Sequence, residues 1–234
     1  MPDTPPDSPP ESPQAADLPQ LDGPRMDPAS GQPAKQLVIL SHGYGSDGAD
    51  LIGLAQHWAG LLPDAAFVSP NGPQRCPSSP TGYQWWDIGS FSQEERLAGV
   101  RSAAPILDKF IDQELSSLGL GDEDLALVGF SQGTMMSLHV GLRRSQTPAC
   151  ILGYSGALVG AELLATEATA KPPIMMIHGD SDQMLPATAM QQAVQELGQA
   201  GFSVDWHISP GLGHGVDPTG LHLGGEFIAK HMIK

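Results

Sequence analysis

Residues 125–142 read Leu-Ala-Leu-Val-Gly-Phe-Ser-Gln-Gly-Thr-Met-Met-Ser-Leu-His-Val-Gly-Leu, and they predict a buried strand, a sharp turn and a helix in direct succession. The apolar run 125–128 ends at Gly129. After Gly133, the apolar residues Met135, Leu138 and Leu142 recur three and four positions apart, which is helical spacing. Ser131 therefore stands at the turn between the strand and the helix.

The sequence around Ser131, Gly-Phe-Ser-Gln-Gly, has the form of a nucleophile elbow, a turn that lifts a serine hydroxyl clear of a sheet edge. Glycine at 129 and 133 leaves space where a Cβ would collide with a neighbouring strand or helix. The helix N-terminus beneath the turn directs unpaired N–H groups at any oxyanion formed there. The five-letter pattern is weak by itself, and the alternative is an ordinary strand-to-helix turn with a solvated serine.

Length, charge and cysteine content limit the class of protein. The 234 residues suit one α/β domain. The formal net charge of −15 argues against nucleic acid and anionic membrane surfaces as partners, because neither offers a counter-charge. No run approaches the length of a membrane span. Cys76 and Cys150 are far apart and form no Cys-x-x-Cys, so we expect neither a disulfide framework nor a zinc site, and a reducing, cytoplasmic location.

Residues 1–34 differ from the rest of the chain, with ten of the 22 prolines, six acidic residues and almost no apolar side chains. Such a segment buries too little surface to offset the entropy of ordering it. It also lacks the basic start and apolar core of a secretory signal. We expect a disordered tail over 1–34, or a docking segment for a partner, and a folded catalytic domain over 35–234.

The folded part alternates strands with helices, which predicts an α/β fold with a mostly parallel central sheet and helices on both faces. Only some 18 residues separate Ser155 from Pro173, too few for a cap domain. A proline at 105 predicts a kink or a restart in the long helix that contains it. The strands are expected at 36–40, 65–69, 125–128, 150–154, 174–177 and 204–208, and the helices at 51–62, 97–118, 133–142, 188–197 and 225–233.

Two loops following strands carry candidate site residues. The first, Ser41-His-Gly-Tyr-Gly-Ser-Asp-Gly, lacks the glycine patterns that cradle phosphate, and in a serine hydrolase it supplies one oxyanion N–H, here that of Tyr44. A plain strand-to-helix connection is the alternative. The second, residues 70–92, contains Trp85 and Trp86, and we expect one tryptophan to pack the loop and the other to line a groove, without choosing between them.

A nucleophilic serine needs a histidine to take its proton and a carboxylate to orient that histidine. His214 lies between glycines in a loop after the last strand and is the preferred base, with His222 as a weaker competitor. For the acid, Asp182 is preferred over Asp180, Asp205 and Asp217, because a residue past the tight Gly179 turn can reach back to the histidine, while Asp180 holds the loop by local hydrogen bonds. The run His178-x-Asp180-x-Asp182 can also be read as metal ligands, but one close-packed loop gives no complete site.

With these residues in place, the chain resembles the carboxylesterase/phospholipase family that includes acyl-protein thioesterases and lysophospholipases. The resemblance covers about residues 36–234 and implies an uncapped α/β-hydrolase with the triad Ser131, Asp182 and His214. The resemblance also implies an oxyanion hole from the N–H groups of Tyr44 and Gln132. We expect no cofactor and no metal. We assign Trp85, Trp86, Met184 and Leu185 to substrate binding. The matching motifs are His42-Gly-Tyr-Gly, Trp85-Trp-Asp, Gly129-Phe-Ser-Gln-Gly-Thr-Met, His178-Gly-Asp-Ser-Asp-Gln-Met-Leu-Pro and Gly213-His-Gly.

The sequence thus predicts a carboxylesterase that acts through an acyl-enzyme on small-molecule or lipid-like esters of short to medium chain. The chain has no basic patch for anionic lipid, so acyl-protein thioesterase or lysophospholipase activity is the second choice within the class. A non-catalytic binding protein of the same fold is the alternative from another class. A homodimer is possible.

Overall fold

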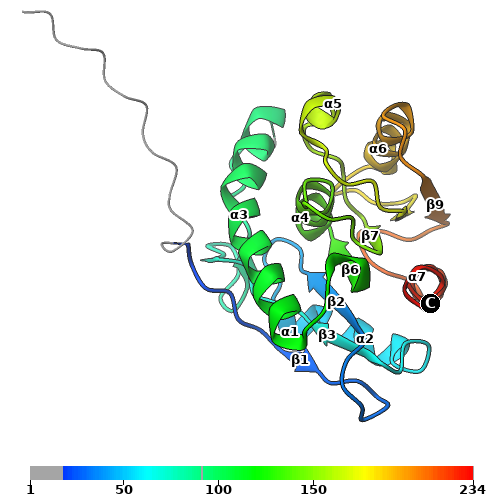
Figure 1. Cartoon of the computed structure of the whole chain (residues 1–234). Helices are drawn as coiled ribbons and strands as arrows, with labels where there is room; N and C mark the ends of the chain where they lie inside the picture. The colour runs from blue at the N-terminus through cyan, green and yellow to red at the C-terminus, as the bar shows by residue number, and fades with distance from the viewer. Residues whose placement is uncertain (1–17, 91, 234) are drawn as a thin grey trace, which may run out of the picture.

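The computed structural model describes residues 18–90 and 92–233, which form a seven-stranded sheet with helices on both faces (Figure 1). Strand order across the sheet is β1-β3-β2-β6-β7-β8-β9, and every neighbouring pair is parallel except β1 with β3. The predicted fold is confirmed. The strands are β1 (Arg25–Met26), β2 (Gln36–Ser41), β3 (Ala65–Val68), β6 (Leu125–Phe130), β7 (Cys150–Tyr154), β8 (Ile174–Gly179) and β9 (Val204–Ser209).

Each face of the sheet has its own apolar core because the central strands are apolar on both sides. In β2, Leu37 and Ile39 face one core, and Val38 and Leu40 face the other. The first core contains side chains of α3 (Gln93–Leu118), α4 (Gln132–Gly141) and α6 (Ala187–Gln199). The second contains side chains of α1 (Gly48–Leu51), α2 (Gly53–Trp58) and α7 (Pro218–Met232). The continuous apolar runs seen in the sequence follow from this burial on two sides.

The chain between β7 and β8 leaves the carboxyl edge of the sheet uncovered. It contains only the 3-10 turn η3 (Ala161–Leu163) and the short helix α5 (Leu164–Glu167). The long loop after β3 contains a small hairpin of β4 (Gln74–Arg75) and β5 (Tyr83–Gln84), and a 3-10 turn, η2 (Asp122–Asp124), precedes β6. No cap domain interrupts the described part of the chain, in agreement with the sequence.

The predicted tail boundary at residue 34 is wrong. Residues 1–17 lie outside the described residues, but the chain from residue 18 onward is packed on the domain. Strand β1 pairs with β3, Leu21 is buried in the first core, and Arg25 forms an ion pair with Glu114 of α3. Composition failed here because a short strand, a buried leucine, an ion pair and backbone hydrogen bonds such as that from the Ser30 N–H to the Pro63 carbonyl dock a proline-rich segment on a sheet that already exists.

Three predicted helices differ from those observed. The helix expected at 51–62 is divided into α1 and α2 at Ile52. Helix α3 passes through Pro105 as one element, so it does not restart there. Helix α7 begins at Pro218, not at residue 225, because the Asp217 side chain caps it by accepting a hydrogen bond from the Gly220 N–H at 2.8 Å. His222 is therefore inside this helix.

Among the described residues, no helix is both long enough and apolar enough to cross a membrane.

The approach of α4 to the sheet depends on glycine at one position. A Cβ on Gly133 would lie 1.8 Å from the carbonyl oxygen of Ser41 and 2.7 Å from that of His42, and backbone atoms cannot move aside cheaply. We predict that Gly133→Ala lowers the free energy of unfolding in urea by about 3 kcal/mol or more. Gly198→Ala is the control, since a Cβ at this helical position in α6 meets nothing within 4 Å and replacing glycine there is expected to stabilise by roughly 0.5–1 kcal/mol. Equal effects of the two substitutions would contradict the packing argument.

Candidate active site

Ser131 stands at a sharp turn between β6 and α4 and has a backbone conformation that side chains rarely adopt, with φ 54° and ψ −114°. The Ser131 N–H donates to the carbonyl of Tyr154 at the end of β7, at 2.9 Å. The Thr134 hydroxyl lies 2.8 Å from the same carbonyl and 2.9 Å from that of Gly129. These bonds hold a strained turn between two central strands, which is the arrangement expected at a functional serine.

Asp182 and His214 are brought together from two loops at the same edge of the sheet. The Asp182 Oδ2 lies 2.7 Å from the His214 Nδ1. The other oxygen, Oδ1, accepts hydrogen bonds from the N–H groups of Met184 and Leu185, both at 2.9 Å. Burial alone would raise the pKa of Asp182, but the hydrogen bonds from the Leu185 N–H, His214 and the Met184 N–H bring it below its ordinary value. The carboxylate is thus held ionised and fixed beside the imidazole.

The other candidate acids and the other candidate base lie elsewhere. Asp180 accepts hydrogen bonds from the Gly211 N–H and the Ser181 hydroxyl, so it holds the loop as expected. Asp217 caps α7, and Asp205 is exposed on β9. His222 lies in α7 beside Glu226, with 3.3 Å between its Nε2 and the carboxylate.

His178 is a second histidine on Asp182, and sequence reasoning missed this role. It is completely buried, and its Nε2 lies 2.8 Å from the carbonyl of Leu185 and 3.1 Å from the Asp182 Oδ2. Both neighbours are acceptors, so Nε2 carries the proton. The His178 N–H therefore steadies the same carboxylate oxygen, Oδ2, that contacts His214. The signal was present in the sequence as a histidine four residues before the preferred acid, but it was weighed only as a metal ligand.

Ser131 and His214 line one cavity of about 330 Å³. The walls are mostly apolar, and the ring of Phe130 packs on the imidazole of His214 with 4.9 Å between centroids. Ser155, another residue with positive φ, donates from its hydroxyl to the carbonyl of Gly215 at 3.2 Å. Sequence reasoning also missed this contact, which ties the histidine loop to the end of β7.

Tyr44 and Gln132, whose N–H groups are the predicted oxyanion donors, both line this cavity. Gln132 is the first residue of α4, so its N–H has no partner inside the helix. The loop with Tyr44 is fixed by buried His42, whose Nε2 accepts from the Gly72 N–H at 2.8 Å. Burial lowers the pKa of His42, which keeps this nitrogen free to accept.

The two tryptophans have different positions, and assigning Trp85 to substrate binding is wrong. Trp85 has no exposed surface, and its indole N–H donates to the carbonyl of His42 at 2.9 Å. Trp86 lines the cavity together with Met184 and Leu185. The Gln132 side chain binds both backbones, accepting from the Trp85 N–H and donating to the Trp86 carbonyl, each at 2.9 Å. One ring packs the loop and the other faces the groove, as the sequence led us to expect.

Comparison with known proteins shows the family to which the chain belongs. Residues 28–232 match the family model described as phospholipase/carboxylesterase. An acyl-protein thioesterase 1 from Gibberella zeae is 30% identical over 83% of this chain and 90% of its own length. Esterase YpfH from Escherichia coli is 30% identical over 86% of this chain and 83% of its own length.

A solved structure is similar over nearly the whole domain. The crystal structure of esterase PE8 is 42% identical, covers 91% of this chain and 99% of its own, and superimposes with a TM-score of 0.87. The uncapped sheet, the serine turn and a family match over residues 28–232 lead to one conclusion: this chain belongs to the phospholipase/carboxylesterase family of α/β-hydrolases.

Proposed function

We propose that the protein hydrolyses carboxylic esters of short to medium acyl chain through an acyl-enzyme formed on Ser131. The observation that carries the proposal is the bond of 2.7 Å between Asp182 and His214, with that histidine in the same cavity as the strained serine. An oriented imidazole beside a serine hydroxyl is the arrangement that makes a hydroxyl nucleophilic.

In the first half of the reaction, the Ser131 oxygen attacks the ester carbonyl carbon while His214 takes the hydroxyl proton. Asp182 stabilises the imidazolium that forms. The N–H groups of Tyr44 and Gln132 stabilise the negative charge on the carbonyl oxygen, and each such donor typically contributes about 2.7 to 4 kcal/mol. The carbon–oxygen bond to the alcohol then breaks, and the alcohol leaves with the proton from His214.

In the second half, water attacks the acyl carbon of the ester on Ser131. His214 takes a proton from the water and returns it to the serine oxygen as the acid leaves. The same base therefore serves both halves, and no further group is needed for the balance of protons.

The proposed acyl length follows from the shape of the cavity. It is about 330 Å³ in volume and bounded by Trp86, Ile88 and Met135, and Met184 at its lip has 76% of its surface exposed. An apolar groove of this size favours an acyl chain over a polar group and limits its length. The esterases among the relatives support an oxygen ester.

A thioester substrate is the second candidate, supported by the relatives named acyl-protein thioesterase. The nucleophile and base would be unchanged, and a thiol would leave in place of the alcohol. A cytoplasmic location and a homodimer stay predictions from the sequence.

The nucleophile is tested by Ser131→Ala. We expect kcat for p-nitrophenyl butyrate to fall at least about a thousandfold and labelling by a fluorophosphonate probe to disappear, because no other group replaces the attacking oxygen. Ser137→Ala is the matched control, as this serine is buried in the same helix and its hydroxyl has no hydrogen-bond partner among the described residues. Activity above a few per cent in the Ser131 variant would end the assignment. A wild type that is neither active nor labelled would instead leave a binding protein as the alternative.

The acid is tested by Asp182→Asn. We expect kcat to fall about 10³- to 10⁴-fold, since the amide favours the wrong tautomer of His214 and cannot stabilise the imidazolium. Asp180→Asn is the control, because that side chain holds only the loop, and we expect kcat within a factor of about ten of the wild type. A larger loss in the control than in the Asp182 variant would reverse the two roles.

Acyl length and leaving group are tested by one assay series. We expect kcat/KM on p-nitrophenyl esters to peak between butyrate and octanoate and to fall for palmitate, because a long chain leaves the groove for solvent. Matched octanoyl esters and thioesters, with a lysophospholipid beside them, measure the choice of leaving group. A maximum at palmitate or on the lysophospholipid would contradict the proposed substrate class and leave the nucleophile assignment intact.

A further inference from the structure

Arg96 is the arginine among the residues that line the cavity containing Ser131 and His214. It belongs to the first turn of α3 and is half-buried. Gly99, three positions further along the helix, contacts the ring of Trp86 so closely that a Cβ there would lie 2.2 Å from it. Residues three apart share a helix face, so Arg96 stands on the side of α3 that meets the tryptophan loop.

Arg96 differs from the other arginines in having no side-chain partner in the described part of the chain. Arg25, Arg101, Arg143 and Arg144 each pair with at least one carboxylate, and Arg75 lies over the ring of Tyr83 at 4.2 Å from its centroid. Arg96 has no ion pair or side-chain hydrogen bond with any residue in 18–90 or 92–233. In a chain with net charge −15, carboxylates are abundant, so an unpaired guanidinium inside a cavity wall is unusual.

Neither the dipole of helix α3 nor the adjacent Glu95 explains a positive charge at position 96. A cation in the first turn of a helix faces the positive end of the helix dipole, so position 96 favours an acidic residue. The adjacent Glu95 instead accepts hydrogen bonds from the backbone N–H groups of Gly89 and Ser90, which closes the loop before α3. Arg96 is therefore placed at an electrostatic cost to its own helix.

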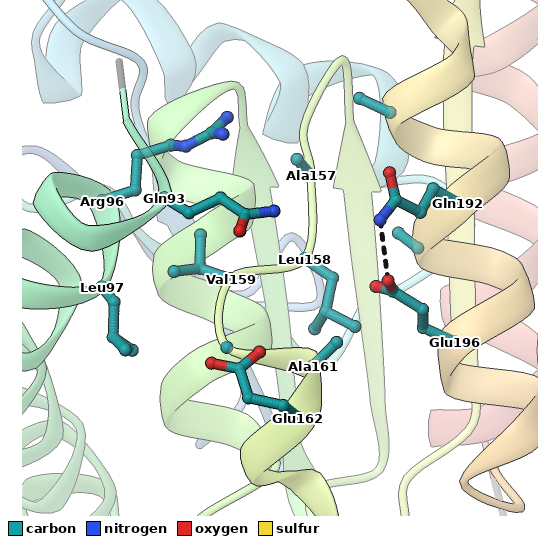
Figure 2. Close-up of a pocket in the computed structure, with 13 residues that line it drawn as sticks. Gln93, Arg96, Leu97, Ala157, Leu158, Val159, Ala161, Glu162, Gln192 and Glu196 are labelled. Atoms are coloured by element: carbon teal, nitrogen blue, oxygen red, sulfur yellow. Dashed lines mark hydrogen bonds between the residues drawn. The ribbon is translucent and has the colours of Figure 1, made fainter. Parts of the chain in front are cut away.

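Arg96 also lines a second, smaller cavity of about 120 Å³ between α3 and α6 (Figure 2). Its far walls contain Glu162 and Glu196, and Figure 2 shows both carboxylates well apart from the guanidinium of Arg96. The Gln192 amide donates to Glu196 at 2.8 Å. An anion is disfavoured in that cavity, because two carboxylates already line it. The serine cavity, in contrast, has no acidic residue in its lining.

We propose that Arg96 binds an anionic group of the substrate, so that this enzyme selects esters that carry a carboxylate a few bonds from the reacting carbonyl. This inference rests on the proposed function and adds the substrate class. The guanidinium presents a planar fork of N–H donors that matches a carboxylate in two parallel hydrogen bonds. The apolar walls then hold the carbon chain between the two ends, and the absence of acidic side chains from the lining leaves the attraction unopposed.

The experiment compares charged and neutral esters of equal length on the full chain. Monoethyl esters of succinic, glutaric and adipic acid test a carboxylate on the acyl side, against ethyl butanoate, pentanoate and hexanoate. Acetyl esters of hydroxy acids, against acetyl esters of the matching simple alcohols, test the leaving-group side. For the wild type we expect kcat/KM to favour the charged member on one of the two sides, and this preference to decrease with added salt.

For Arg96→Gln we expect that preference to fall about tenfold, while kcat/KM on the neutral esters stays within a factor of about two. Arg96→Lys keeps the charge without the fork and is expected to be intermediate. Arg101→Gln is the matched control, because it makes the same change in net charge on the same helix, but its partner is Glu167, outside the cavity.

Three outcomes would overturn the inference: no preference for charged esters in the wild type on either side, an equal loss on charged and neutral esters in Arg96→Gln, or the same loss of preference in Arg101→Gln. None of these outcomes would contradict the proposed hydrolysis itself, which is tested by Ser131→Ala on neutral esters.

Discussion

The site depends on one constraint, the close approach of helix α4 to strands β2 and β6 beneath Ser131. A Cβ at Gly129 would lie 2.4 Å from the backbone of Gly133, and a Cβ at Gly133 would meet the carbonyl of Ser41. Only glycine at both places lets the helix start directly under the end of the strand. The serine between them then takes a positive φ and lines the cavity at this edge of the sheet. The remaining site residues are arranged around this fixed point.

Loops after different strands are joined there by buried side chains and not by the sheet alone. Gln132 binds the backbone of the tryptophan loop, Trp85 binds the carbonyl of His42, and His42 binds the Gly72 N–H. The Asp182 carboxylate contacts both His178 and His214, and the Ser155 hydroxyl donates to the carbonyl of Gly215 in the histidine loop. Buried polar groups that are satisfied in this way make loops rigid, and the proposed mechanism needs rigid loops because oxyanion donors must be in place before charge develops.

The sequence predicted the central strands well, since apolar runs buried on both faces have no competing interpretation. The sequence also predicted that Ser131, Asp182 and His214 lie at one edge of the sheet. Parallel strands end at the same edge, and the order of serine, acid and histidine along the chain limits the choice of residues. The sequence did not predict the start of α7, where glycines at 220, 224 and 225 interrupt the apolar spacing and only Asp217-Pro218 marks the cap. Nor did the sequence predict that Trp85 is buried. Whether an aromatic side chain in a long loop packs in the core or lines a groove depends on contacts with residues far away in the chain.

Strand β1 of the N-terminal segment covers the edge of the sheet, which the composition of the segment did not predict. β3 would otherwise be the outermost strand of the sheet, with a row of unsatisfied amides and carbonyls available to any other extended chain. The two residues Arg25 and Met26 occupy that row, and the prolines at 24 and 28 on either side cannot extend the ladder to a further strand. The segment therefore protects the molecule from edge-to-edge association, and a shortened form beginning at residue 35 would be exposed to aggregation even with its catalytic groups complete.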